Sequence, residues 1–215
     1  GEHATRARGA VPSFLSDQPD GAAYPFAASL CVSINNEVVH GIPSEKRILR
    51  NGDIVSIDGG LSFQGYYVDA ARTFIVGNPA KDGDRKAQEL IAATKEACDA
   101  AISVIRPGKH LGDIGAAVMR VAANRNFAIV EDLGGHGLGE LPHEKPFIAN
   151  EGREGEGEEI LEGMVLAIEP MLAEGKGAIV VEEDDWTCSM ADGKRAAHFE
   201  DTILVTKDGS EILTR

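Results

Sequence analysis

Residues 53–76 have the sequence DIVSIDGGLSFQGYYVDAARTFIV, in which two β-rich runs flank a glycine-containing stretch. Such runs predict two paired strands, and we expect the turn to be centred between Phe63 and Gln64. In that register Asp58 lies directly opposite Asp69, and directly opposed residues have Cβ atoms only about 5 Å apart. Two carboxylates at this separation destabilise a sheet unless a cation lies between them. The stretch therefore predicts a hairpin that carries a cation site.

The rest of the chain predicts strands, then helices, then strands. Two strands joined by a tight turn at Asn35-Asn36 are expected before the hairpin, because asparagine tolerates left-handed backbone angles. Apolar residues at helical spacing predict two helices after it, the second capped by Asp113. The expected segments are strands within 28–39, helices at 87–105 and 114–122, a glycine-rich loop at 134–139, an exposed acidic loop at 150–159, and strands at 164–168, 178–181, 199–206 and 211–214. This order indicates an α+β fold with a largely antiparallel sheet.

The length and composition indicate one domain. A chain of 215 residues, 43% of them hydrophobic, can bury one sizeable core. Residues 1–27 contain turn formers and little periodic apolar pattern, so we expect an irregular leader there. Because the chain begins with Gly1 and not with methionine, this leader is interpreted as the remnant of a longer N-terminal segment. Residues 28–215 are expected to form the single domain.

Charge and cysteine content argue against several classes of function. The chain has 21 basic and 35 acidic residues and a net charge of -14, whereas nucleic-acid-binding proteins are usually basic. Its three cysteines are widely spaced and indicate neither a disulfide framework nor a thiolate zinc site. No apolar run approaches the roughly 20 residues that span a bilayer. We therefore expect a soluble cytoplasmic protein that binds neither nucleic acid nor a membrane.

Five residues of types that bind hard or borderline cations are expected at the ends of strands. Each is weak evidence alone, because an aspartate at a strand end is more often a turn residue. Glu169 is stronger evidence, because it follows the apolar run at 164–168, where a buried carboxylate is costly unless it is paired or metal-bound. Asp58 follows a similar run at 54–57. The five candidate ligands are Asp58, Asp69, His136, Glu169 and Glu200.

Short motifs occur around these candidates in a fixed order. They are CVSINNEVVHGIP at 31–43, the pair Asp58 and Asp69, GHGLG at 135–139, PHEKP at 142–146, AIEPM at 167–171 and HFE at 198–200. Any one of these strings is too short to be specific, but the ordered set is specific. From about Arg8 to the C-terminus, the chain resembles the bacterial type I methionine aminopeptidases.

The resemblance implies a pita-bread fold, in which two pseudo-symmetric halves surround a central site, and it implies metal-binding roles. Asp69 and Glu200 would bridge two divalent cations, which could be Mn, Fe, Co or Zn. His136 and Glu169 would bind one of these cations, and Asp58 would bind the other. The cations would acidify a water that attacks the scissile carbonyl. Glu169 would also carry the proton of that water to the leaving amine.

The resemblance also implies a substrate site. His143 would lie beside the developing oxyanion, and His40 beside the scissile amide nitrogen. Together with these histidines, Phe26, Cys31 and Trp186 would surround an apolar slot for an unbranched thioether, although plain core packing is the alternative for the two aromatic residues. The expected reaction is removal of the N-terminal methionine from peptides or nascent chains with a small second residue. We expect a monomeric enzyme that could act close to the ribosome.

Three positions depart from the family's usual pattern. Pro142 replaces a bulkier residue, Val68 replaces a glycine and Asp201 replaces a histidine. None of them removes a candidate ligand, although Pro142 could widen the slot for the first side chain. Two other functions stay open. An aminopeptidase P or prolidase would share the strings DAARTF at 69–74 and HGLG at 136–139, and a non-catalytic binding module on the same fold would generally have lost ligands that are all present here.

Overall fold

The computed structural model describes residues 1–19, 22–82 and 84–215, in which strands predominate and two long helices lie between the fifth and sixth strands. The elements are α1 (Glu2–Arg6), β1 (Val11–Pro12), β2 (Cys31–Ile34), β3 (Glu37–Val39), β4 (Ile54–Phe63), β5 (Tyr66–Ile75), α2 (Pro79–Asp82), α3 (Arg85–Ser103), α4 (Leu111–Arg125), β6 (Ala128–Ile129), β7 (Gly134–Gly137), β8 (Glu144–Ala149), β9 (Val165–Ile168), β10 (Met171–Ala173), β11 (Ile179–Val181), β12 (Cys188–Met190), β13 (Ala196–His198), β14 (Glu200–Thr206) and β15 (Gly209–Ile212). The predicted α+β class is therefore confirmed.

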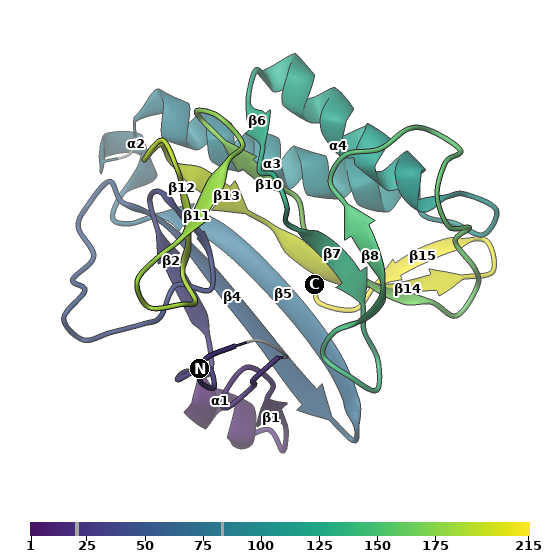
Figure 1. The fold of residues 1–215 in the computed structure, drawn as a ribbon, viewed down its shortest axis with the longest axis horizontal. Helices are drawn as coiled ribbons and strands as arrows, with labels where there is room; N and C mark the ends of the chain where they lie inside the picture. Colours follow the sequence, from purple (N-terminus) through teal and green to yellow (C-terminus); the bar gives the residue numbers. More distant parts are fainter. Residues whose placement is uncertain (20–21, 83) are drawn as a thin grey trace.

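The main sheet has nine strands within the described ranges, and its paired strands are antiparallel. They run in the order β1-β4-β5-β14-β9-β7-β8, with β2 added to β4 and β15 added to β14. Two smaller sheets of three strands have the orders β13-β10-β6 and β11-β12-β3. The helices α3 and α4 lie side by side along one edge of the view in Figure 1, while the long β4–β5 hairpin extends away from them.

The β4–β5 hairpin differs from the expected register by a small shift. Its turn is Gln64-Gly65, with φ angles of 53° and 88°, and Phe63 pairs with Tyr66. Two-residue hairpin loops favour positive φ at both central positions, and a glycine makes this conformation accessible. Consequently Asp58 pairs with Ala71 and Asp69 pairs with a glycine, so the prediction that the two aspartates are directly opposed is wrong.

The two predicted helices are confirmed, and their ends have clear causes. The Asp84 side chain caps α3 by accepting a hydrogen bond of 2.8 Å from the Ala87 backbone N–H. Asp113 lies in the first turn of α4 and accepts a 2.9 Å bond from the backbone N–H of His110, which is the N-cap residue. Asp113 therefore stabilises the start of α4 from inside the helix, not from the cap position that we expected. Asn126, with a left-handed φ of 57°, ends α4.

The segment expected as a glycine-rich loop at 134–139 contains strand β7. Its glycines allow close approach between strands, because a Cβ at Gly135 would lie 2.1 Å from the Ala167 carbonyl oxygen and one at Gly137 would lie 2.3 Å from that of Lys145. Glycine is usually a turn signal in a sequence, whereas here it is required by packing between strands. As a result His136 belongs to a sheet strand and is held by neighbours on both sides.

The N-terminal segment contains two short elements where we expected an irregular leader. Helix α1 covers residues 2–6, and β1 pairs with β4 through Val11 and Ser62. Positions 20 and 21 lie outside the described residues. The division of the chain into a leader at 1–27 and a domain at 28–215 stays a prediction.

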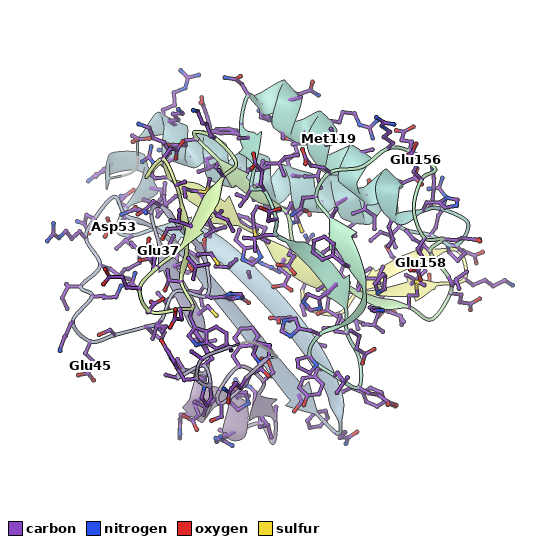
Figure 2. The ribbon with its side chains drawn as sticks, in the orientation of Figure 1. Glu37, Glu45, Asp53, Met119, Glu156 and Glu158 are labelled. Carbon is purple, nitrogen blue, oxygen red and sulfur yellow. The ribbon has the colours of Figure 1, made fainter. Side chains whose placement is uncertain are left out.

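The predicted acidic loop at 150–159 is mostly exposed, although Asn150 at its start is buried. Its residues Glu156 and Glu158 are exposed, and Figure 2 shows both at the periphery of the molecule, as it does Glu45 on the opposite side. These glutamate side chains are thus solvated. None of the helices in the described part of the chain is long and apolar enough to cross a membrane.

Candidate metal centre

The hairpin brings two buried carboxylates to the same face of the sheet. Asp58 is 8% exposed and Asp69 is 6% exposed. Since Asp58 pairs with Ala71 and Asp69 lies two residues before Ala71, the aspartates are diagonal neighbours. Burial, followed by the charge of Glu169, raises the pKa of Asp58 to about 7. Burial and the neighbouring Asp58 raise the pKa of Asp69 well above its ordinary value, so both ionised forms are disfavoured without a compensating positive charge.

Strand β14 adds a third buried carboxylate on the other side of β5. Glu200 on β14 pairs with Ala71 on β5, and Ala71 also pairs with Asp58 on β4. The three residues therefore form a row across three strands, with the small alanine between the two acids. Burial, and then the charges of Asp69 and Glu169, raise the pKa of Glu200 well above normal. The backbone at Asp69 is fixed by Thr202, whose hydroxyl accepts from its N–H and donates to its carbonyl oxygen, each at 2.8 Å.

His136 completes a group of three potential ligands. One ligand atom each from Asp69, His136 and Glu200 lies within 4.8 Å of the others. Nδ1 of His136 is 2.8 Å from the carbonyl oxygen of Gly137, which fixes the proton on Nδ1 and leaves the Nε2 lone pair free. Burial lowers the pKa of His136 to about 4, so the ring is neutral and able to bind a cation.

Glu169 follows the end of β9 and faces two imidazole rings. Its Oε1 lies 3.5 Å from Nε2 of His136, and its Oε2 lies 3.5 Å from Nε2 of His198. Its carbonyl oxygen accepts a 3.2 Å hydrogen bond from Nδ2 of Asn150. Burial and the charge of Asp69 raise the pKa of Glu169 well above normal. Glu169 is thus a largely buried carboxylate, with its side chain 12% exposed, and no cationic side chain is shown beside it among the described residues.

These donors fit a divalent cation site. Carboxylate oxygens and imidazole nitrogen suit hard and borderline metals, and the ligand group joins both donor types. Oδ1 of Asp58 is buried and has no hydrogen-bond partner among the described residues. Buried carboxylates at such close range are stable as anions only when positive charge compensates them. A metal centre explains the arrangement, whereas ordinary core packing does not.

A cavity of about 280 Å³ opens onto these ligands. All ten predicted site residues line it, namely Phe26, Cys31, His40, Asp58, Asp69, His136, His143, Glu169, Trp186 and Glu200. The ring centroids of His136 and His143 are 4.5 Å apart. Burial lowers the pKa of His40 to about 4 and also lowers the pKa of His143. Both rings are therefore neutral and can each donate one hydrogen bond.

The cavity has an apolar end made by a small aromatic cluster. The rings of Phe26 and Trp186 meet edge to face with centroids 5.1 Å apart, and Trp186 also contacts the ring of His40. Cys31 is buried in this cluster, and burial raises its thiol pKa well above normal, which disfavours a nucleophilic thiolate. Phe14 and Met171 line the cavity too. Sequence reasoning missed both, although Met171 lies in the AIEPM string and its hydrophobic type suited the slot.

Asp201, which departs from the family's usual histidine, is a structural residue. It is 1% exposed and accepts hydrogen bonds from Arg72 at 2.6 Å and from Arg215 and Thr214 at 2.9 and 2.8 Å. Arg72 also donates to the carbonyl oxygen of Glu200. Asp201 and Arg72 together hold the backbone beside Glu200 from outside the cavity.

Several proteins similar to this chain are methionine aminopeptidases. The chain is 43% identical to the methionine aminopeptidase of Aquifex aeolicus, over 98% of this chain and 81% of that protein. It is 45% identical to methionine aminopeptidase 1 of Mycobacterium tuberculosis, over 99% of this chain and 79% of that protein. The sequence model of metallopeptidase family M24 matches residues 3–207.

Solved structures agree with these relatives. The crystal structure of methionine aminopeptidase from Thermotoga maritima matches with a TM-score of 0.91 at 42% identity, over 99% of this chain and 82% of that chain. A prolidase from Pyrococcus horikoshii matches less well, with a TM-score of 0.67 at 27% identity, over 91% of this chain and 50% of that chain. The predicted pita-bread fold is thereby confirmed. The chain belongs to metallopeptidase family M24.

Proposed function

We propose that this protein is a metal-dependent methionine aminopeptidase, which removes the N-terminal methionine from peptides with a small second residue. One observation carries the proposal: the five candidate ligands and the two candidate catalytic histidines all line one cavity that has an apolar end. The proteins named above as relatives support the same activity. The prolidase alternative is weaker, because that likeness is more distant in both sequence and structure.

In this proposal the five ligands hold two divalent cations. Asp69 and Glu200 would each serve both cations, His136 and Glu169 would hold one, and Asp58 would hold the other. When bound, the cations acidify a water and polarise the scissile carbonyl. Mn, Fe, Co and Zn all suit this donor set, and availability often decides between them.

Three side chains move or donate protons around the scissile bond. The Glu169 carboxylate accepts a proton from the attacking water and delivers it to the leaving amine. His143 donates a hydrogen bond to the oxygen on which negative charge develops, and His40 donates to the scissile amide nitrogen. The lowered pKa of each histidine supports this role, because a neutral imidazole near pH 7 still carries one N–H.

The shape of the cavity supports selectivity for small second residues. His40, His136 and His143 crowd the space where the second residue must lie, and a displacement of about 1 Å of the reacting group can cost on the order of a hundredfold in rate. The aromatic cluster with Cys31 and Met171 accepts the methionine side chain, since soft and aromatic groups suit a thioether. Because Pro142 replaces a bulkier residue next to His143 in the sequence, we expect selectivity at the first position to be weaker than at the second.

Hydrolysis of four peptides tests the proposal. With cations added to metal-free protein, Met-Ala-Ser should be cleaved fastest, Leu-Ala-Ser more slowly, and Met-Leu-Ser very slowly. Cleavage of an Ala-Pro peptide in preference to Met-Ala-Ser would favour the prolidase alternative, and binding of cations without cleavage of any peptide would favour a non-catalytic module. We further propose that the enzyme is a cytoplasmic monomer acting on nascent-chain N-termini close to the ribosome.

A further inference from the structure

His198 is the last residue of β13, and its imidazole lies behind the candidate metal centre. The residue is 1% exposed and, unlike Glu169, it does not line the cavity. Neither ring nitrogen has a hydrogen-bond partner within the ranges that the structure describes. An unsatisfied buried polar atom is costly, so a role for this ring must come from the groups that it faces.

The carboxylate of Glu169 lies between two imidazole rings, and only one of them has a hydrogen bond that fixes its tautomer. Nε2 of His136 is 3.5 Å from one carboxylate oxygen, and Nε2 of His198 is 3.5 Å from the other. The ring of His136 carries its proton on Nδ1, because that atom bonds the Gly137 carbonyl oxygen. No such bond among the described residues fixes the tautomer of His198, so its proton is free to lie on Nε2, facing Glu169.

The backbone presents the His198 ring rigidly. The hydroxyl of Thr73 accepts a 2.9 Å bond from the His198 backbone N–H and donates a 2.8 Å bond to its carbonyl oxygen. His198 also pairs with Met171 across β13 and β10. A neutral imidazole carries one N–H, while an ionised carboxylate only accepts hydrogen bonds.

We propose that His198 is a positioning residue. Its Nε2–H donates a hydrogen bond to Oε2 of Glu169, and this bond directs Oε1 of Glu169 toward the cations and the substrate. The 3.5 Å separation is longer than a formed N–H···O bond, and contacts of this kind often tighten when an active site is occupied. Partners of this kind typically change metal affinity or activity by about 10- to 100-fold when removed. The inference deepens the proposed function and rests on it for the peptidase readout, whereas the metal-binding readout is independent of it.

Two substitutions separate hydrogen bonding from packing. His198→Gln keeps an N–H donor with similar reach, so its dissociation constant for Mn²⁺, and its kcat on Met-Ala-Ser, should stay close to wild type. His198→Met fills similar space without a donor, so metal affinity and kcat should each fall by about 10- to 100-fold while KM changes little. Calorimetric titration of the metal-free proteins with Mn²⁺ and steady-state kinetics measure these values, and Tm reports folding.

Further variants keep the test decisive. His198→Asn retains an amide that is too short to reach Oε2, so it should behave like His198→Met, and it replaces that variant if the latter fails to fold. Thr94→Val is the control, because Thr94 is fully buried and, among the described residues, its hydroxyl bonds only to Leu90 within α3. The metal affinity of this variant should equal that of wild type. Two results would overturn the proposal. One is that His198→Met and His198→Asn both keep the metal affinity and kcat of wild type, and the other is that His198→Gln and His198→Met lose them equally.

Wild-type protein that binds Mn²⁺ but cleaves no peptide would instead refute the proposed function. The comparison of metal affinities would still test the role of His198.

Discussion

Asp58 and Asp69 lie diagonally across the β4–β5 hairpin, each two positions from the residue that pairs with the other: Asp58 pairs with Ala71 and Asp69 pairs with Gly60. Diagonal neighbours are about 7–8 Å apart, compared with about 5 Å for a direct pair. The two-residue offset keeps both side chains on one face, and it leaves more room for cations than direct opposition would. A shared cation site therefore requires that the side chains of Asp58 and Asp69 lie on one face of the sheet, and it does not require that the two residues pair directly.

The proposed bridging ligands should matter more for metal binding than the terminal ligand. Asp69→Ala and Glu200→Ala each remove a group that contacts both cations, so we expect these variants to retain little metal. Asp58→Ala removes a ligand from one cation, and at least one equivalent should remain. Metal content after gel filtration, measured by atomic emission, checks the ranking. Equal residual metal in all three variants would contradict the assignment of the bridges.

The neighbouring rings of His136 and His143 should have separable effects. His136→Ala should reduce both bound metal and kcat, because it removes a proposed ligand. His143→Ala should leave bound metal nearly unchanged and lower kcat, by an amount comparable to the 10²- to 10³-fold loss seen when an oxyanion donor is removed. Metal analysis and kinetics on the same preparations compare them. If His143→Ala lost its metal, the donor role would be misassigned.

Metal-free protein should become less stable as the pH rises above about 6.5. The pKa of Asp58 is raised to about 7, and those of Asp69, Glu169 and Glu200 are raised well above normal. A raised acid pKa in the folded state gives stability that is present below the unfolded pKa and is lost as pH rises through the folded pKa. Four histidines, His40, His136, His143 and His198, have lowered pKa values, so their opposite contribution is complete once the pH exceeds their unfolded pKa of about 6.5.

Thermal unfolding at several pH values between about 6.5 and 8 measures this effect, because in this window the histidine contribution is nearly complete and the cysteine thiols, with an ordinary pKa of about 8.5, stay mostly protonated. Tm of the metal-free protein should fall with pH, and saturating Mn²⁺ should abolish the fall by compensating the carboxylate charges and stabilising the folded state. Asp58→Asn should reduce the slope in the metal-free protein. A metal-free Tm that rises across this window would mean that the carboxylates are compensated by the protein itself.

Gly60 should be required for the position of Asp69. A Cβ at Gly60 would lie 2.1 Å from Oγ of Ser13, 2.9 Å from Cε1 of Phe14 and 3.2 Å from Oδ2 of Asp69. Gly60→Ala should therefore destabilise the protein by about 1–3 kcal/mol, as overpacking does, and reduce its metal content. Gly209→Ala is the matched control, because no described atom lies within 4 Å of a Cβ there. Unchanged Tm and metal content in Gly60→Ala would refute this role.

The sequence predicted the two helices and a set of candidate ligands, but it did not predict the hairpin register or every strand. The two helices follow from local apolar periodicity, and the ligand set follows from the ordered motifs. The hairpin register was missed, because it depends on which residues take positive φ at Gln64-Gly65. The strand at His136 was missed because glycines required for close strand contact resemble a loop in the sequence.

Contacts between distant segments were the least predictable part of the site. Phe14 enters the cavity because β1 pairs with β4, and a two-residue strand has almost no sequence pattern. Arg72 and Asp201 are 129 positions apart, and their ion pair depends on the pairing of β5 with β14. His198 likewise faces Glu169 through contacts that no local pattern encodes.

The most direct test of the account is release of free methionine from Met-Ala-Ser by metal-free protein, followed before and after addition of Mn²⁺, Fe²⁺, Co²⁺ or Zn²⁺. We predict no release before addition, release after addition of at least one of these cations, and no release by a Glu169→Gln variant under the same conditions. The account would be contradicted if methionine were released equally fast without any cation. It would also be contradicted if no methionine were released by protein shown, for each cation in turn, to have bound two equivalents.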